Sequence, residues 1–172
     1  MVGDEAVEAP KEREGVVPRV ELLEGRREGD FLDVMVGEIY SPEKFYLQVL
    51  HCPAPLPQML VAGQQYDLDD LMDDLEDGYR RGAGPDQLLE VGELVLHLHC
   101  AVNLPAERNN KWYRAEVTGM EEGLVQVYLL DMGLVAAVPS TPCHLRRLLV
   151  QFTSMPAQAV RARLDLRPPG SR

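Results

Sequence analysis

The chain has 172 residues, 28 acidic against 17 basic side chains, and a net charge of −11. Its length suits one domain or two small, tightly joined ones, and its 45% apolar content can form a buried core. The negative charge argues against a protein that grips phosphate backbones, because that function needs clustered Lys and Arg. No apolar run approaches the roughly 20 residues that span a bilayer, and the acidic N-terminus lacks the apolar core of a secretory signal.

The charge is concentrated in the middle of the chain. Residues 31–90 hold twelve acidic and three basic side chains, so they carry −9 of the −11. The net charge therefore favours a basic or neutral partner. The three cysteines are widely spaced and form no CxxC pair, which predicts reduced thiols in a cytosolic or nuclear protein.

The first third of the chain predicts a leader followed by two strands. Residues 1–28 are rich in Glu, Arg, Gly and Pro and are expected to form a mobile leader or the end of a linker, in which residues 17–23 are the candidate for a short ordered stretch. Residues 31–36 and 45–50 are β-rich runs joined by a Pro-containing turn. The three prolines of residues 52–57 end this sheet.

Residues 67–82 predict an acidic amphipathic helix. Its apolar residues fall on one face and are Leu68, Leu71, Met72, Leu75 and Tyr79. Its acidic residues cover much of the rest and are Asp67, Asp69, Asp70, Asp73, Asp74, Glu76 and Asp77. Arg80 and Arg81 are expected in the last turn, where cations are favoured. The acidic face is either a solvated surface or an electrostatic wall for an Arg-rich ligand.

From Val91 onward the apolar pattern changes to a period of two. Strands are predicted over residues 94–102, 112–117, 124–131 and 134–138, a helical turn or short helix over 145–152 and a last strand over 159–166. Several short strands at this spacing indicate a small, strongly bent antiparallel barrel.

No catalytic constellation stands out in the sequence. His97 and His99 alternate on one predicted strand, but two histidines alone are a weak metal signal and are read as the polar face of a half-buried strand. The motifs of serine hydrolases, zinc proteases and nucleotide-binding folds are absent. We therefore expect no enzymatic activity, no cofactor and no metal.

Three separate motifs, in order, give the chain a resemblance to a known family. They are Val36-Gly37-Glu38-Ile39-Tyr40-Ser41-Pro42-Glu43-Lys44-Phe45-Tyr46-Leu47-Gln48, the pair Trp112-Tyr113-Arg114-Ala115 and Leu130-Asp131-Met132-Gly133, and Phe152-Thr153-Ser154-Met155-Pro156-Ala157-Gln158-Ala159. Together they resemble an extended Tudor domain.

The resemblance implies a mostly β fold with connecting helices, in which a small bent Tudor barrel is joined by a helix to a staphylococcal-nuclease-like subdomain of OB type. The implied boundaries are a leader at 1–28, the extended Tudor domain at 29–166 (nuclease-like parts 29–66 and 148–166, linking helix 67–82, Tudor core 91–140) and a tail at 167–172.

Extended Tudor domains are non-catalytic modules that bind arginine-bearing peptides. The ligands that the resemblance implies are Gly/Arg-rich segments and the tails of Piwi-clade Argonautes, commonly with symmetrically dimethylated arginine. The family also suggests a cytoplasmic location in the ribonucleoprotein granules of germ cells and a role in the small-RNA pathway.

The family's methylarginine cage is mostly missing from this sequence. Its positions carry Tyr113, Leu129, Met132 and Leu134, and the loop 103–110 supplies no aromatic residue. Leu and Met side chains offer dispersion but no ring face for a cation. Tyr128 cannot replace the lost ring at residue 129, because neighbouring residues on a strand point to opposite faces. The resemblance also implies structural roles for Trp112 in the core, Arg114 and Asp131 as an ion pair, and Gly133 in the turn.

The sequence therefore leaves three hypotheses. The first is a peptide-binding adaptor that does not depend on arginine methylation, with Asp70, Asp73, Asp74 and Asp77 as groove acids. The second is a scaffold or self-association module in which Met132 and Leu134 form an apolar contact. The third and least favoured is single-stranded RNA binding through the OB-type half, since the basic residues Arg146, Arg147, Arg161 and Arg163 are more simply explained by ion pairs within the fold.

Overall fold

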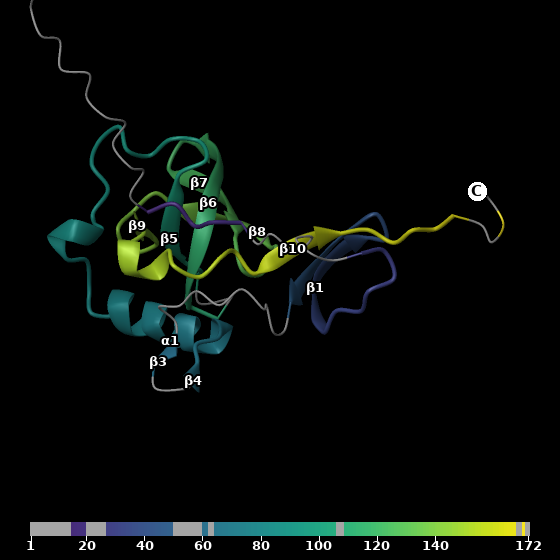
Figure 1. The fold of residues 1–172 in the computed structure, drawn as a ribbon. Coiled ribbons are helices and arrows are strands. Elements are labelled where there is room, and N and C mark those ends of the chain that lie inside the picture. Colours follow the sequence, from purple (N-terminus) through teal and green to yellow (C-terminus); the bar gives the residue numbers. More distant parts are fainter. Residues whose placement is uncertain are drawn as a thin grey trace, which may run out of the picture.

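The computed structural model describes residues 15–19, 27–49, 60–61, 64–105, 109–167 and 170. The described strands and the α-helix are β1 (Val34–Ser41), β2 (Lys44–Val49), β3 (Leu60–Val61), β4 (Gln64–Gln65), α1 (Leu68–Tyr79), β5 (His99–Asn103), β6 (Trp112–Glu121), β7 (Leu124–Leu129), β8 (Val135–Pro139), β9 (Leu145–Arg147) and β10 (Ala159–Ala162). Figure 1 shows α1 below the five-stranded sheet and β1 and β10 to its side. The mostly β architecture that the sequence predicted is confirmed.

The barrel is a five-stranded antiparallel sheet with the order β8-β7-β6-β5-β9. β9 pairs with β5, with Cys100 opposite Arg147, so the fifth strand lies outside the 91–140 range predicted for the barrel. Residues 145–147 thus form a strand where a helical turn was predicted, and one turn of 3-10 helix follows at Val150–Phe152. The barrel encloses one apolar core, which includes Val102, Val117 and Val127, all fully buried.

β5 is shorter than the predicted strand 94–102, and the placement of His97 and His99 on one strand is wrong. β5 begins at His99, whereas His97 lies in a turn with φ +67°. This turn is fixed by the barrel, because the His97 N–H donates to the Val117 carbonyl at 2.8 Å. Both histidines still meet one carboxylate, with His97 Nδ1 at 2.9 Å and His99 Nε2 at 3.4 Å from Glu116.

Helix α1 is confirmed, and its apolar face packs on the barrel. Asp67 and Asp70 form a reciprocal capping box, which satisfies the first free N–H groups of the helix. Tyr79 is buried and its ring stacks on Trp112 at 5.0 Å between centroids. Arg80 and Arg81 follow the helix rather than lying in its last turn, because the helix ends at Tyr79 with Arg80 as its C-cap.

The second sheet joins the two ends of the domain, with the order β1-β2-β10. β1 continues to Ser41, beyond the predicted end at residue 36, since two register shifts absorb Gly37 to Tyr40 and keep the pairing with β2. On the other side of β2, Ala159 of β10 pairs with Gln48. Residues 50 and 52–57, with their predicted sheet-breaking prolines, lie outside the described residues.

Residues 15–19, here called the N-terminal strap, lie on the barrel. Residues 17–19 fall in the stretch 17–23 for which order was allowed, and residues 15 and 16 extend that order into the part predicted to be mobile. Val17 is only 3% exposed and belongs to a core cluster with the helix and residues 148–155. The Val17 N–H donates to His99 Nδ1 at 2.8 Å, and the Ala157 N–H donates to the Pro18 carbonyl at 2.9 Å. The strap is therefore held by one buried apolar side chain and by two hydrogen bonds of its backbone, one to a side chain and one to another backbone group.

In the described part of the chain, no helix is both long and apolar enough to cross a membrane.

We expect the attachment of the N-terminal strap to the barrel to weaken in acid. Burial lowers the pKa of His99, an effect that Arg114 and Arg19 reinforce and Glu116 opposes. The folded state thus favours neutral His99, whose Nδ1 can accept the Val17 N–H. Its contribution to stability is complete above the ordinary histidine pKa of about 6.5 and is lost as the pH falls from there through the lowered value. We expect the Val17 amide to lose hydrogen-exchange protection over this range.

The matched control is His99→Asn, whose side-chain oxygen can accept the same N–H but does not titrate. In this variant the protection of Val17 should stay constant between pH 7 and 5. Equal loss of protection in both proteins would contradict the role of His99.

Candidate functional site

The four cage positions are packed into the protein. Leu129 is 1% exposed and Tyr113 is 7% exposed, and both belong to the barrel core. Met132 and Leu134 are half-buried and pack against the same core. The described side chains at the cage thus fill much of its space themselves, and they present little aromatic surface.

Tyr113, the one aromatic residue left at the cage positions, has its hydroxyl engaged. Asn109 Nδ2 donates to the Tyr113 hydroxyl at 2.7 Å. Asn109 and Asn110 both have positive φ angles, +78° and +51°, which Asn tolerates better than most residues. This turn therefore holds an amide over the Tyr113 hydroxyl at the start of β6.

The loop that carries Met132 and Leu134 is a tight turn between β7 and β8. The Leu129 N–H donates to the Leu134 carbonyl at 2.8 Å, and the Gly133 N–H returns a bond to the Leu129 carbonyl at 2.9 Å. Gly133 has φ +75°, and a Cβ atom there would lie 2.3 Å from the Tyr46 ring. Only glycine satisfies both the turn and this close approach.

The second sheet grips this loop through polar contacts. Gln48 of β2 is buried, and its Nε2 donates to the Asp131 carbonyl at 2.7 Å and to Met132 Sδ at 3.4 Å. The Tyr40 hydroxyl of β1 donates to the Gly133 carbonyl at 3.1 Å, and the Val135 N–H donates to that hydroxyl at 3.3 Å. The orientation of the loop is thus set by residues that lie far before it in the sequence.

The Arg114–Asp131 pair predicted from the resemblance is present and almost fully buried. Arg114 Nε and Nη2 donate to the two oxygens of Asp131 at 2.9 and 2.6 Å, and the two side chains are 0% and 2% exposed. The remaining Arg114 protons go to the carbonyls of Phe152, Met155 and Pro156. Asp131 also accepts the Gln158 N–H at 3.0 Å. One ion pair therefore connects the barrel, the loop after β7 and the segment that leads into β10.

The four acids predicted for the groove lie on the exposed side of α1. Asp70 serves the capping box, and Asp74 accepts the Tyr66 hydroxyl at 2.6 Å. The remaining two are Asp73 and Asp77, for which the described residues provide no hydrogen bond or ion pair. The structure thus leaves Asp73 and Asp77 available to a ligand, while Asp70 and Asp74 have structural partners.

The helix also holds the barrel through residues that the sequence did not single out for this role. Glu76 accepts the Trp112 N–H at 2.6 Å, and the Tyr79 hydroxyl donates to the Arg147 carbonyl at 2.8 Å. Trp112 is buried between Tyr79 and Arg146, whose guanidinium lies 4.5 Å from the Trp112 ring centroid. The core role predicted for Trp112 is therefore observed.

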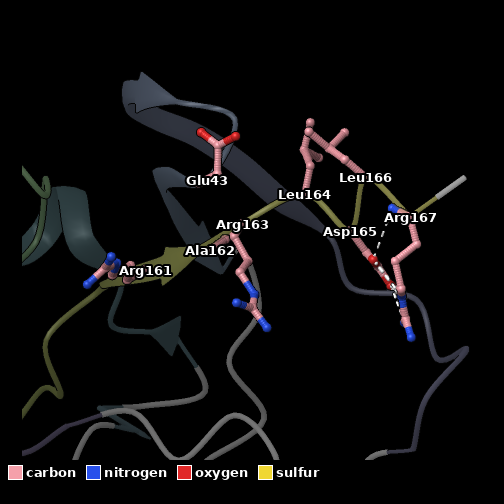
Figure 2. A pocket seen from close by; sticks show the side chains of 8 residues that line it. All are labelled: Glu43, Arg161, Ala162, Arg163, Leu164, Asp165, Leu166 and Arg167. Atoms are coloured by element: carbon pink, nitrogen blue, oxygen red, sulfur yellow. Dashed lines mark hydrogen bonds and ion pairs between the residues drawn. The ribbon is translucent and has the colours of Figure 1, made fainter.

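The predicted basic set divides into two kinds of residue. Arg146 is buried and donates to the carbonyls of Pro142 and Tyr79, and Arg147 pairs with Glu93 at 2.6 Å. Arg161 and Arg163 are exposed and line a hollow with Glu43, as Figure 2 shows. The predicted ion pair is thus found for Arg147, whereas Arg146 is held by hydrogen bonds to neutral groups, with no ion pair among the described residues. Within the described ranges, no three His, Cys, Asp or Glu side chains are grouped to hold a metal ion.

The Tudor domain family model matches residues 26–166. The chain belongs to the Tudor domain family. Tudor domains are non-catalytic binding modules, so this Tudor domain is not an enzyme.

Two curated relatives carry the same domain within longer chains. The Homo sapiens Tudor and KH domain-containing protein is 29% identical over 136 residues, which cover 78% of this chain and 21% of that protein. Its Drosophila melanogaster homolog is 25% identical over 151 residues, which cover 83% and 23%. The chain therefore spans about a fifth of the length of these relatives.

Solved structures identify the extended form of the domain. The extended Tudor domain TD3 from mouse TDRD1, in complex with a MILI peptide containing dimethylarginine, superposes with a TM-score of 0.65 at 26% identity, covering 91% of this chain and 69% of that chain. The Drosophila melanogaster Papi extended Tudor domain gives a TM-score of 0.60 at 21% identity, with 78% and 62% covered. The barrel, α1 and the β1-β2-β10 sheet thus form an extended Tudor fold.

We expect Asp131→Asn to lower the free energy of unfolding by about 3–5 kcal/mol, because it leaves the buried Arg114 charge unpaired. Chemical denaturation would measure the loss. Glu93→Gln is the control, since it neutralises the partner of the more exposed Arg147 and should cost much less. Similar losses in the two variants would show that the buried pair contributes no more to the free energy of unfolding than the more exposed pair does.

Proposed function

We propose that this extended Tudor domain is an adaptor that binds arginine-bearing peptides without requiring arginine methylation. Gly/Arg-rich segments and Piwi-type tails are the ligand class. This proposal rests on the side chains at the cage positions. Leu129 lies in the barrel core, Met132 and Leu134 are half-buried, and Tyr113 is the one aromatic residue among the four.

The residues at the cage positions affect the preference for methylated arginine, because rings and carboxylates stabilise a bound guanidinium in different ways. Each ring that a methylated guanidinium stacks on contributes about 0.5–2 kcal/mol, and three of the four cage positions here carry Leu or Met. A plain guanidinium instead gains from carboxylates, with which it forms charge-assisted bonds. The exposed Asp73 and Asp77 and the −9 charge of residues 31–90 favour a cationic ligand of this kind.

The relatives support the ligand class but not the methylation state. The similar TD3 domain from mouse TDRD1 is described with a MILI peptide that contains dimethylarginine. For the present chain we propose a ligand of the same class, a peptide that bears an arginine in any methylation state. From the same family likeness we also propose a cytoplasmic location, in germ-cell ribonucleoprotein granules.

Calorimetric titration of two peptides with one sequence, one with plain and one with symmetrically dimethylated arginine, tests the proposal. We expect both to bind, with affinities that differ by less than tenfold. A gain of tenfold or more for the dimethylated peptide would rule out methylation-independent recognition, and failure of both to bind would rule out the arginine-ligand function.

The role of the helix is tested by the double variant Asp73→Asn/Asp77→Asn. We expect it to weaken binding of the plain peptide by about threefold or more, in keeping with two partly exposed charge contacts. The matched control is Glu121→Gln/Glu122→Gln, which removes the same charge at the β6–β7 hairpin and should leave the affinity nearly unchanged. Equal effects would assign the loss to net charge rather than to α1.

The scaffold function remains the second candidate, and for it we propose the exposed apolar residues of β1 as the contact surface. Met132 accepts a contact from Gln48 and is half-buried, whereas Met35, Val36 and Ile39 of β1 are 51%, 55% and 69% exposed. Light scattering of the chain and of Ile39→Lys tests this candidate. A dimer that the variant breaks would support it, and a monomer in both samples would reject it.

A further inference from the structure

We propose that the ring of Tyr40 is a second cation site, occupied in the free protein by Lys44, and that the arginine of a bound peptide displaces Lys44 from it. The inference rests on the proposed arginine-ligand function and names a subsite for it. It places an aromatic contact on β1, outside the four cage positions of the barrel.

The ring already holds a cation. Lys44 Nζ lies 4.8 Å from the centroid of the Tyr40 ring, within the range of a cation–π contact. Tyr40 is 45% exposed, so its ring is open to solvent and to a ligand. A guanidinium is more weakly hydrated than an ammonium and stacks better on a ring, so it can compete with the lysine for this position.

The Tyr40 ring is held next to the loop that carries Met132 and Leu134. The Tyr40 hydroxyl contacts the Gly133 carbonyl and the Val135 N–H, the two backbone groups that flank Leu134. Leu134 is one of the four cage positions that the family resemblance implies. An arginine directed to this loop therefore meets Tyr40 beside that cage position.

The ring is also preorganised. Tyr40 packs edge-on against Tyr46, at 6.1 Å between centroids and 78° between planes, and Tyr46 in turn lies 5.6 Å from Tyr128 of β7. Tyr46 is 9% exposed, so this row of rings is fixed from the barrel outward to Tyr40. A ring fixed at both its edge and its hydroxyl loses little conformational freedom when a cation binds.

The direct test is NMR of the unmodified chain with N-acetyl-arginine amide as the probe. In the free protein, the Lys44 εCH₂ protons should be shifted by the ring current of Tyr40, and Tyr40→Leu should abolish that shift. Addition of the probe should return these protons toward their ordinary position. If they stay unmoved at a probe concentration that saturates shifts elsewhere, or show no ring-current shift at all, the second cation site is excluded.

Three variants extend the test to the peptide titration. Tyr40→Leu removes the ring and should weaken binding of the plain peptide by about fivefold, whereas Tyr40→Phe keeps the ring and should retain most of the affinity. Lys44→Met keeps the aliphatic stem without the competing charge and should tighten binding by about threefold. Weaker binding by Lys44→Met, or wild-type affinity for Tyr40→Leu, would overturn the proposal.

The two proposals fail in different ways. If neither peptide binds but the arginine amide displaces Lys44, the ligand proposal fails and the cation site stands. If the peptides bind and neither Lys44 nor Tyr40 responds, the cation site fails and the adaptor function stands.

Discussion

The Arg114–Asp131 pair organises the extended Tudor domain because its polar atoms are shared among three parts of the fold. Its two residues come from β6 and the loop after β7, and its remaining bonds hold the carbonyls of residues 152, 155 and 156. A buried guanidinium is tolerated only when all its donors are satisfied, so the path of the chain toward β10 is fixed by that requirement. The second sheet and the barrel are joined at the same place through Gln48 and the Asp131 carbonyl.

This junction also explains how the cage could lose its rings without loss of the fold. The loop of Met132 and Leu134 is shaped by Gly133, by the backbone bonds to Leu129 and by contacts from Tyr40 and Gln48. Apart from the Gln48 contact with Met132 Sδ, these contacts are made to backbone atoms and not to the side chains at the cage positions. The architecture and the ligand chemistry are therefore separable here, and the binding site can change while the junction is retained.

Much of the fold could be predicted from the sequence, because periodicity and capping signals are local. The helix, the strands of the barrel and the Arg114–Asp131 pair follow from such patterns and from the family motifs. The errors arose where distant contacts override a local pattern. The run before His99 alternates like a strand, yet His97 has a positive φ and lies in a turn whose N–H bonds to the Val117 carbonyl. The leader is polar, and its ordered part begins at residue 15, two residues before the stretch 17–23, where Val17 packs with the helix and residues 148–155. The contacts of Tyr40, Gln48 and Glu76 have no local signature, since their partners lie 95, 83 and 36 positions away in the chain.

The N-terminal strap has a consequence for the order of events during synthesis. Residues 15–19 are the first described residues to be made, yet their contacts include His99 and Ala157. β2 likewise cannot pair with β10 until β10 has been made, and Arg114 cannot donate to the carbonyls of residues 152–156 before those residues are made. Contacts between such distant positions are slow to form because a long loop must close first. The domain therefore cannot close fully as it emerges residue by residue, and its first segment cannot complete its native contacts until Ala157, just before the last strand, has been translated.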